Sequence, residues 1–292
     1  MKKHSYLEKY RTNNTFEDYS KKLLDIIAEM RELKYKEIEE NDKSDKKALQ
    51  NFIENKFLRE GDKLLSLQVV GSFLHGTDTI NSDYDFKGIF IPSKKSLLLK
   101  EKRQSYKFSS TKNAHKNGNK DIDITFYSLH FVLEKLAQGD FNFLELIFAL
   151  REKNNCVYRS KRAKCLYNNR FKFFDKEGLR HSLLGFIKNH YLNINDKIVA
   201  RETYDKSDLK RLAHAYRALI MLQEVLNTKN ILFPLKGAEF IRNIKENKID
   251  IFMAIERIEK RLPVLKKEIN KSTFILEEVN KKDIETMILS FY

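Results

Sequence analysis

The run from Gly71 to Ile91 constrains the fold more than any other stretch of the sequence. It follows a short β-prone segment, Leu67-Gln68-Val69-Val70, and ends in Ile89-Phe90-Ile91-Pro92, so two strands are predicted on either side of a small glycine-containing turn. Residues two apart in a strand point to the same face, and Asp83 and Asp85 are therefore predicted to project together. Two carboxylates held so close repel each other, and a divalent cation with oxygen ligands usually relieves that repulsion.

A phosphate site is predicted upstream of these carboxylates. Gly71 and Ser72 offer backbone N–H groups and a small hydroxyl that can approach a phosphate closely. The run then combines a phosphate site with a metal site. The alternative is a surface hairpin in which the Asp and Asn side chains only stabilise turns.

Together these residues resemble the active-site signature of the DNA polymerase beta superfamily of nucleotidyltransferases: a Gly-Ser pair, a gap of about ten residues, and then Asp-x-Asp. The stretch from Ser82 to Ile89 looks most like the YcgL-like branch, which is related to the RNA-ligase-associated nucleotidyltransferases. The resemblance extends from about Leu65 to the C-terminus, and it is close only around the signature. One departure is His75, which stands where tyrosine is common in the family.

The charge balance favours a polyanionic partner. Lys and Arg number 56 against 41 Asp and Glu, a formal net charge of +15, which attracts nucleic acid or a nucleoside triphosphate. The alternative is that the high lysine content reflects an AT-biased coding sequence and serves to keep the protein soluble.

Cys156 and Cys165 support neither a disulfide framework nor a zinc site. No apolar run is long enough to span a membrane, and no signal peptide is recognised, so a soluble cytoplasmic protein without a membrane partner is expected.

A third carboxylate is expected on another strand. The segment Asp121-Ile122-Asp123-Ile124-Thr125-Phe126-Tyr127 alternates polar and apolar residues, as in a half-buried strand. Asp121 and Asp123 share one face of it. The resemblance favours Asp123, because the run that begins there is similar to the family's third-strand motif, and Asp121 is the alternative.

The periodicity predicts a change from strands to helices along the chain. Helices are expected near residues 16–33 and up to about Glu60, short strands from Leu65 to Tyr127, a loop from Lys107 to Lys120, and helices from Ser160 onward. The predicted fold class is α+β: a small mixed sheet flanked by helices, then an all-helical C-terminal domain. The predicted domains are 1–155, catalytic, and 156–292, helical, which suits a chain of 292 residues.

A cationic stripe is predicted on the helix expected from Ser207 to Asn227. Lys210, His214 and Arg217 are spaced four and three residues apart, so they share one face of that helix. Such a stripe is commonly solvated surface, but it is also able to hold phosphates. A similar Lys-x-x-x-His-x-x-Arg stripe occurs in the YcgL-like branch, and this resemblance favours phosphate binding.

The resemblance implies a metal-dependent nucleotidyltransferase that moves a nucleoside monophosphate from a nucleoside triphosphate, ATP among them, to a hydroxyl on RNA and releases pyrophosphate. The implied catalytic and metal-binding residues are Asp83, Asp85 and Asp123, with two Mg²⁺ or Mn²⁺ ions. The nucleotide-binding residues are predicted to be Gly71, Ser72, Gly76, Thr77, Ser82, Lys87, Lys210, His214 and Arg217. Glu145 lies among apolar residues, and a helix-surface position without a catalytic role is expected for it, with a buried acid as the alternative. The alternatives are a non-catalytic nucleotide- or RNA-binding module, or transfer to a protein or small-molecule hydroxyl.

Overall fold

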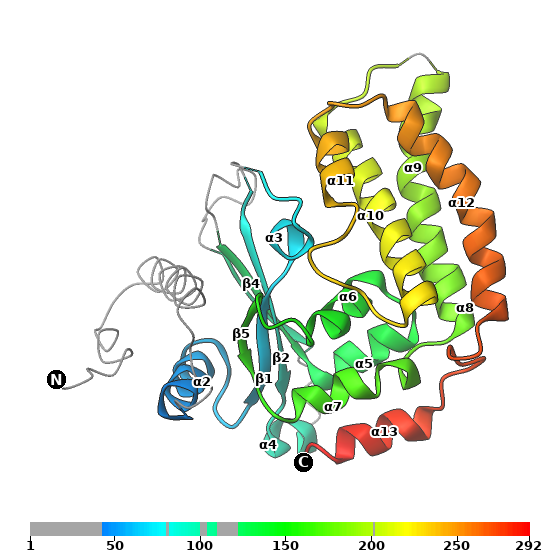
Figure 1. The fold of residues 1–292 in the computed structure, drawn as a ribbon. Coiled ribbons are helices and arrows are strands. Elements are labelled where there is room, and N and C mark those ends of the chain that lie inside the picture. Colours follow the sequence, from blue (N-terminus) through cyan, green and yellow to red (C-terminus); the bar gives the residue numbers. More distant parts are fainter. Residues whose placement is uncertain (1–42, 80–81, 100–103, 110–121, 201) are drawn as a thin grey trace.

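The computed structural model describes residues 43–79, 82–99, 104–109, 122–200 and 202–292. Within these residues the strands are β1 (Lys63–Val69), β2 (Tyr84–Ile91), β3 (Ser105–Ser109), β4 (Ile122–Ser128) and β5 (Cys156–Arg159). They form one mixed sheet in the order β3-β4-β2-β1-β5, at the centre of Figure 1. The neighbours β2 and β4 run parallel, and the other pairs run antiparallel. The predicted α+β class is confirmed.

The burial of the strands follows their side-chain patterns. In β1 every residue after Lys63 is buried, whereas β4 alternates buried and half-buried residues along its whole length. The predicted strand around Asp123 is therefore confirmed. The prediction of a loop from Lys107 to Lys120 was wrong at its start, because β3 occupies Ser105–Ser109 and pairs with β4. Residues 110–121 lie outside the described residues.

Helices cover both faces of the sheet. On one face, helix α2 (Lys43–Phe57) packs Leu49, Ile53 and Phe57 into a core with residues of the strands. On the other face lie α5 (Leu129–Ala137) and α6 (Phe141–Ala149). The helix expected near residues 16–33 lies outside the described residues.

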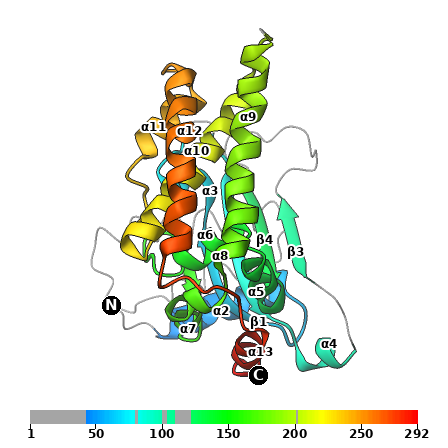
Figure 2. The same ribbon diagram turned by 90° about the vertical axis from the view of Figure 1, so that its right-hand side faces the viewer.

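The C-terminal part of the chain is helical, as predicted. Helix α10 (Lys206–Thr228) packs between α9 (Gly185–Val199), α11 (Ala238–Lys245) and α12 (Ile251–Lys271), and these helices stand beside the sheet in Figures 1 and 2. A capping box of Asp205 and Asp208 begins α10. The shorter helices are α3 (Gly71–His75), α4 (Lys94–Leu98), α7 (Ala163–Asn168), α8 (Lys176–Gly178) and α13 (Lys281–Leu289), and a π-helical segment, η3 (Leu179–Leu184), leads into α9.

The helical part and the sheet share a hydrophobic core. One cluster of buried side chains includes Leu65 and Ile89 of the sheet, Leu144 of α6 and Leu219 of α10. Strand β5 begins at Cys156, so the sheet continues just beyond the boundary expected after residue 155, and the division into domains remains a prediction. Among the described residues, every helix is too short or too polar to cross a bilayer.

Candidate metal centre and nucleotide site

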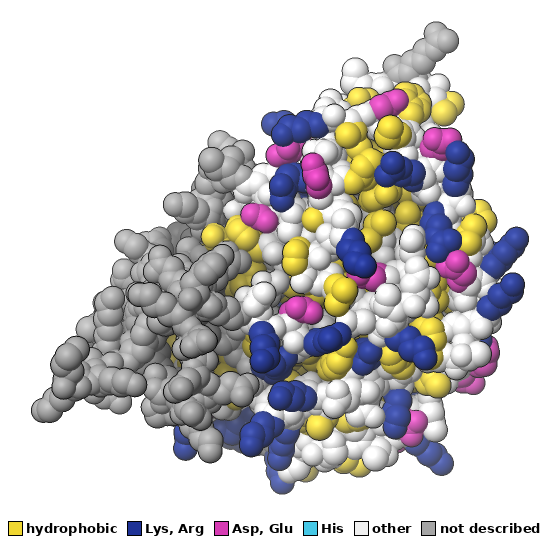
Figure 3. Space-filling model, in the orientation of Figure 1, with side chains coloured by type: hydrophobic (Ala, Val, Ile, Leu, Met, Phe, Trp, Pro, Cys, Tyr) yellow, Lys and Arg dark blue, Asp and Glu magenta, His cyan; other side chains and the backbone are white. Residues whose placement is uncertain are grey.

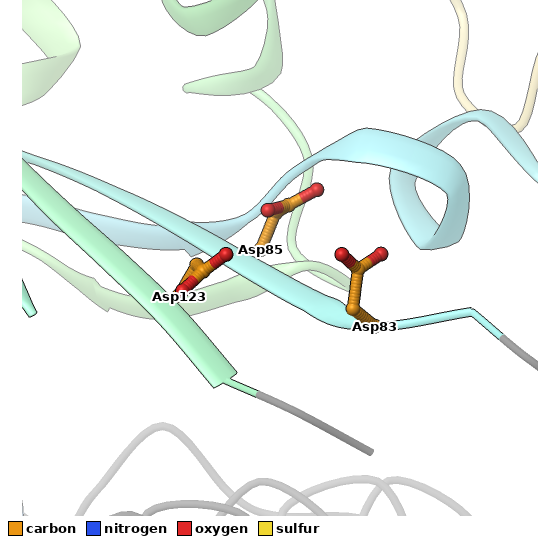
Figure 4. Close-up of side chains that lie close together, drawn as sticks. All are labelled: Asp83, Asp85 and Asp123. Carbon is orange, nitrogen blue, oxygen red and sulfur yellow. The ribbon is translucent and has the colours of Figure 1, made fainter. Parts of the chain in front are cut away.

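Three aspartates converge at one end of the parallel strands. Asp85 lies in β2, Asp83 immediately precedes that strand, and Asp123 is the parallel partner of Asp85 in β4. One oxygen from each of the three carboxylates lies within 4.8 Å of the others, and all three residues are half-buried (Figure 4). Oxygen ligands grouped in this way are suited to Mg²⁺ or Mn²⁺. The alternative third carboxylate, Asp121, lies outside the described residues.

The electrostatics of Asp85 fit a cation at this position. Burial and then the charge of Asp83 raise the pKa of Asp85 to about 6, with a smaller contribution from Asp123 in the same direction. Lys87, on the same face of β2, opposes this shift, as does Lys210 of α10. A divalent cation would remove the repulsion between the carboxylates that these two lysines only partly offset.

This raised pKa predicts a pH-dependent response to metal. The folded protein holds a proton on Asp85 between about pH 4 and pH 6, where the unfolded chain has lost it, so the metal-free protein loses stability as the pH rises through that window. At low pH, Mn²⁺ binding must displace the proton of Asp85, which opposes binding. At high pH, Asp85 is ionised and Mn²⁺ relieves the repulsion between the carboxylates. We therefore expect Mn²⁺ to raise the melting temperature more at about pH 7.5 than at about pH 5 in thermal denaturation. An equal shift at the two pH values would contradict the assignment.

The backbone before the metal site depends on Gly71. Its φ is +67°, and a Cβ added there would lie 2.6 Å from Oδ2 of Asp85. Only glycine combines that left-handed conformation with so close an approach. The Val70 N–H donates to the Asp85 carbonyl at 2.9 Å, and the Thr77 N–H donates to the Ser72 carbonyl at 2.9 Å. The predicted phosphate-binding residues Gly71 and Ser72 thus form the start of α3, directly beside the carboxylates.

Two other predicted nucleotide-binding residues, Gly76 and Thr77, contact the helical part of the chain. Arg242 of α11 donates from Nη2 to the Gly76 carbonyl at 2.6 Å, and Lys245 donates from Nζ to Thr77 Oγ1 at 3.1 Å. Thr77 is buried. The structure therefore places both residues against α11, and direct contact with a nucleotide remains a prediction for them.

Ser82 stabilises the turn that precedes Asp83. Its hydroxyl accepts a hydrogen bond from the Thr79 N–H at 2.9 Å. This bond holds the chain just before it enters β2, so Ser82 helps to orient the carboxylates. A contact between Ser82 and a nucleotide remains a prediction.

The three members of the stripe on α10 differ in charge, burial and surroundings, and only Lys210 acts on a carboxylate of the metal site. Lys210 is exposed and acts on the charge of Asp85, while His214 and Arg217 are half-buried. Burial and the neighbouring Arg217, Lys245 and Lys210 lower the pKa of His214 to about 2, so its ring is neutral. The stripe therefore supplies two cations and one uncharged imidazole.

Arg217 is also part of a buried polar cluster that the sequence reasoning did not find. Its Nη1 donates to Nδ1 of His75 at 3.2 Å and its Nη2 lies 3.7 Å from Oε2 of Glu145, while Nε2 of His75 lies 3.1 Å from the same oxygen. His75 and Glu145 are 0% and 2% exposed, so the expectation of a surface position for Glu145 was wrong. The cluster ties α3 and α6 to α10.

The charges in this cluster are those of one ion pair beside a neutral ring. Burial, opposed by Glu145, lowers the pKa of His75 to about 4. Burial alone would raise the pKa of Glu145, but the neighbouring His75 and Arg217 outweigh it and hold that pKa well below its usual range. Because Nδ1 of the neutral His75 accepts from Arg217, its ring proton stands on Nε2 and faces Glu145.

Lys245 is a functional candidate that the sequence reasoning missed. Burial, followed by Arg217 and Lys210, lowers its pKa to about 8, while Asp78 and Asp83 act in the opposite direction. The charges of both the carboxylates and the cations of α10 therefore act on Lys245. The available signal was its spacing of three residues from Arg242, which places the two cations together beside the buried stripe of Ile241 and Ile244.

The sequence matches the RNA repair pathway DNA polymerase beta family, RlaP, over residues 30–250. The match covers most of the chain, and the protein belongs to this family. The predicted resemblance to the polymerase beta superfamily is thereby confirmed, whereas the narrower placement in the YcgL-like branch remains a prediction.

Two individual proteins are also similar. An uncharacterised 38.9 kDa protein from the nrdC-mobD intergenic region of Enterobacteria phage T4 is 29% identical over 121 residues, which are 40% of this chain and 34% of the phage protein. The chain thus aligns with about a third of the length of that relative. A crystal structure of a nucleotidyltransferase-like protein from Exiguobacterium sibiricum matches with a TM-score of 0.29 and 8% identity, over 71% of this chain and 69% of that one.

Proposed function

We propose that the protein is a metal-dependent nucleotidyltransferase that transfers a nucleoside monophosphate from a nucleoside triphosphate to a hydroxyl group on RNA. The observation that carries this proposal is the convergence of Asp83, Asp85 and Asp123 beneath cations from two helices, Lys210 of α10 and Lys245 of α11. Carboxylates that hold divalent ions, facing cations that hold phosphates, are what phosphoryl transfer needs. The family assignment supports the same reaction class.

In this reaction the acceptor oxygen forms a bond to the α-phosphorus while the bond from that phosphorus to the bridging oxygen of pyrophosphate breaks. The acceptor hydroxyl loses its proton, and pyrophosphate leaves with the electron pair. Two Mg²⁺ or Mn²⁺ ions, when bound, would lower the pKa of the attacking hydroxyl and polarise the phosphoryl oxygens. Asp83 and Asp85 would hold both ions, and Asp123 the ion nearest the acceptor.

The remaining contribution of the protein is positioning and charge compensation. Lys87 and Lys210 act on the charge of Asp85, and Asp83 acts on Lys245, so all three lysines lie near the aspartates over which the triphosphate would lie. Gly71, which has no side chain, allows the backbone to lie close to Asp85 and to the proposed triphosphate site. Fixed cations around the transferring group stabilise the charge that develops on its oxygens.

An RNA acceptor is supported by the charge of the surface and by the description of the family. The segment from 157 to 174 contains six basic residues and no acidic residue, and Lys161, Arg162, Lys164 and Lys172 within it are exposed. In Figure 3, Lys and Arg side chains gather on the lower part of the molecule, where Figure 1 shows α7. A surface of this kind attracts the phosphates of a nucleic acid independently of its sequence.

The proposal is tested by incubating the protein with each of the four α-labelled triphosphates and Mg²⁺, with and without bulk RNA. We expect label to enter RNA with one triphosphate preferred, and RNA binding to weaken by more than about tenfold between about 50 and 200 mM salt. The Asp83→Asn variant is the control and should transfer no label. If label were transferred from the triphosphate at the same rate with and without RNA, RNA would not be the acceptor. If the affinity for RNA did not change with salt, the basic surface would not be its binding site.

A further inference from the structure

The short helix α3 connects the metal site to the helical part of the chain (Figure 1). At its start, a Cβ added to Gly71 would lie 2.6 Å from Oδ2 of Asp85, so the backbone there lies directly against that carboxylate. At its end, His75 is 0% exposed. The helix is five residues long, so little more than one turn separates its two ends. A displacement of His75 is therefore expected to move the backbone beside Asp85.

Three elements of the helical part hold the end of α3. Arg217 of α10 donates from Nη1 to Nδ1 of the His75 ring at 3.2 Å. In the segment that follows α10, the Leu235 N–H donates to the His75 carbonyl at 3.1 Å. The two residues after His75 accept hydrogen bonds from the two cations of α11 described above. The position of α3 thus depends on the helices as well as on the sheet.

The guanidinium of Arg217 is committed to this buried contact. Besides its bond to His75, its Nη2 lies 3.7 Å from Oε2 of Glu145. The side chain of Arg217 is 11% exposed, and its guanidinium stands 5.2 Å from the ring of Phe141. A guanidinium that left Glu145 for a phosphate would leave a buried carboxylate without its counter-charge, which is strongly unfavourable. Lys210, seven residues earlier on α10, is exposed and has no such commitment to the buried cluster.

We propose that Arg217 is a positioning residue, which fixes α3 through the ring of His75 and thereby sets the backbone at Gly71 for the phosphates of the donor. Arg217 then contributes to nucleotide binding without touching the nucleotide. The inference rests on the proposed function, because that function places the triphosphate beside this backbone and Lys210. The spacing of the stripe on α10 predicts instead that Arg217 contacts a phosphate directly.

A double-mutant cycle distinguishes the two roles of Arg217. Calorimetry measures the binding of inorganic tripolyphosphate with Mg²⁺, and of the preferred triphosphate as a non-hydrolysable analogue with Mg²⁺. Arg217→Lys keeps a cation beside Glu145 but loses the planar fork that also reaches His75. His75→Phe keeps a ring in the buried site but removes the acceptor nitrogen.

We expect each single variant to weaken the binding of both ligands by about three- to thirty-fold, as for residues that couple two elements of a fold. The double variant should bind no more weakly than either single variant, because both changes break the same contact. Leu219→Ala, which removes a buried apolar side chain from α10, is the control for a loss of packing. It should lower the melting temperature but leave both affinities unchanged, measured well below the melting temperature of every variant.

The outcomes separate this inference from the proposed function. Normal binding by His75→Phe overturns the inference, because Arg217 would then act without the ring, and the transferase assignment stands. Effects of Arg217→Lys and His75→Phe that add in the double variant also overturn it. Weakening by Leu219→Ala as large as that by His75→Phe would assign the effect to packing and overturn it as well. A wild-type protein that binds neither ligand would overturn the proposed function and this inference with it.

Discussion

Replacing Asp85 with asparagine is expected to lower the rate of nucleotidyl transfer by on the order of a thousandfold or more. Asp85 is the central carboxylate of the three, since it adjoins Asp123 across the parallel strands and its pKa responds to both Asp83 and Asp123. The amide keeps the shape of the side chain but removes the charge that holds the divalent ions. The measurement is the initial rate of pyrophosphate release with Mg²⁺ and the preferred triphosphate.

The same variant should fold normally, and this separates a catalytic defect from a structural one. Burial and neighbouring negative charge penalise the ionised form of Asp85, so an uncharged side chain is expected to leave the metal-free protein at least as stable as the wild type. Thermal denaturation without metal checks this. Asp196→Asn, an exposed position on α9, is the matched control and should retain full activity. An Asp85→Asn protein with nearly wild-type activity would overturn the assignment of the site.

Replacing Glu145 with alanine is expected to destabilise the protein by about 3–5 kcal/mol. The carboxylate is 2% exposed and faces both Nη2 of Arg217 and Nε2 of His75. Its removal leaves the guanidinium of Arg217 without its counter-charge where α3, α6 and α10 meet. Equilibrium unfolding in urea, followed by circular dichroism, measures the loss in the free energy of unfolding.

Two further variants make this prediction specific. Glu145→Gln keeps an acceptor for Arg217 and His75, so it is expected to lose less stability than alanine. Glu134→Ala removes an exposed glutamate from α5 and should change the free energy of unfolding by less than about 0.5 kcal/mol. If Glu145→Ala and Glu134→Ala proved equally stable, the buried cluster would have no role in holding the helices to the sheet.

The metal site was predictable because it depends on short-range regularities. Alternation along Asp121 to Tyr127 predicted a strand with Asp123 on its half-buried face, and the structure has that strand as β4. The Asp-x-Asp spacing predicted two carboxylates on one side, even though Asp83 lies just before β2 rather than within it. The parallel pairing of β2 and β4 brings the three residues together. Short-range patterns do not predict this pairing, and the choice of Asp123 as the third carboxylate came from the resemblance to a known family.

The burial of Glu145 was only an alternative from the sequence, because it depends on packing between segments far apart in the chain. Helix α6 is apolar on nearly all sides, and a single acid in such a helix does not reveal whether a partner exists. The partner, Arg217, lies 72 residues away on α10, and the sequence predicts only phosphate binding for it. Lys245 was missed for the same reason, since its position near Asp83 arises from the packing of α11 against the segment that follows α3.

We propose that the three aspartates support metal-dependent nucleotidyl transfer, and the release of pyrophosphate by the wild-type protein tests this most directly. The assay contains RNA and each nucleoside triphosphate in turn, with either Mg²⁺ or a chelator. We predict release with Mg²⁺ and at least one triphosphate, and none with the chelator. Release that continues at the same rate in the chelator, or no release with any triphosphate in Mg²⁺, would contradict the account.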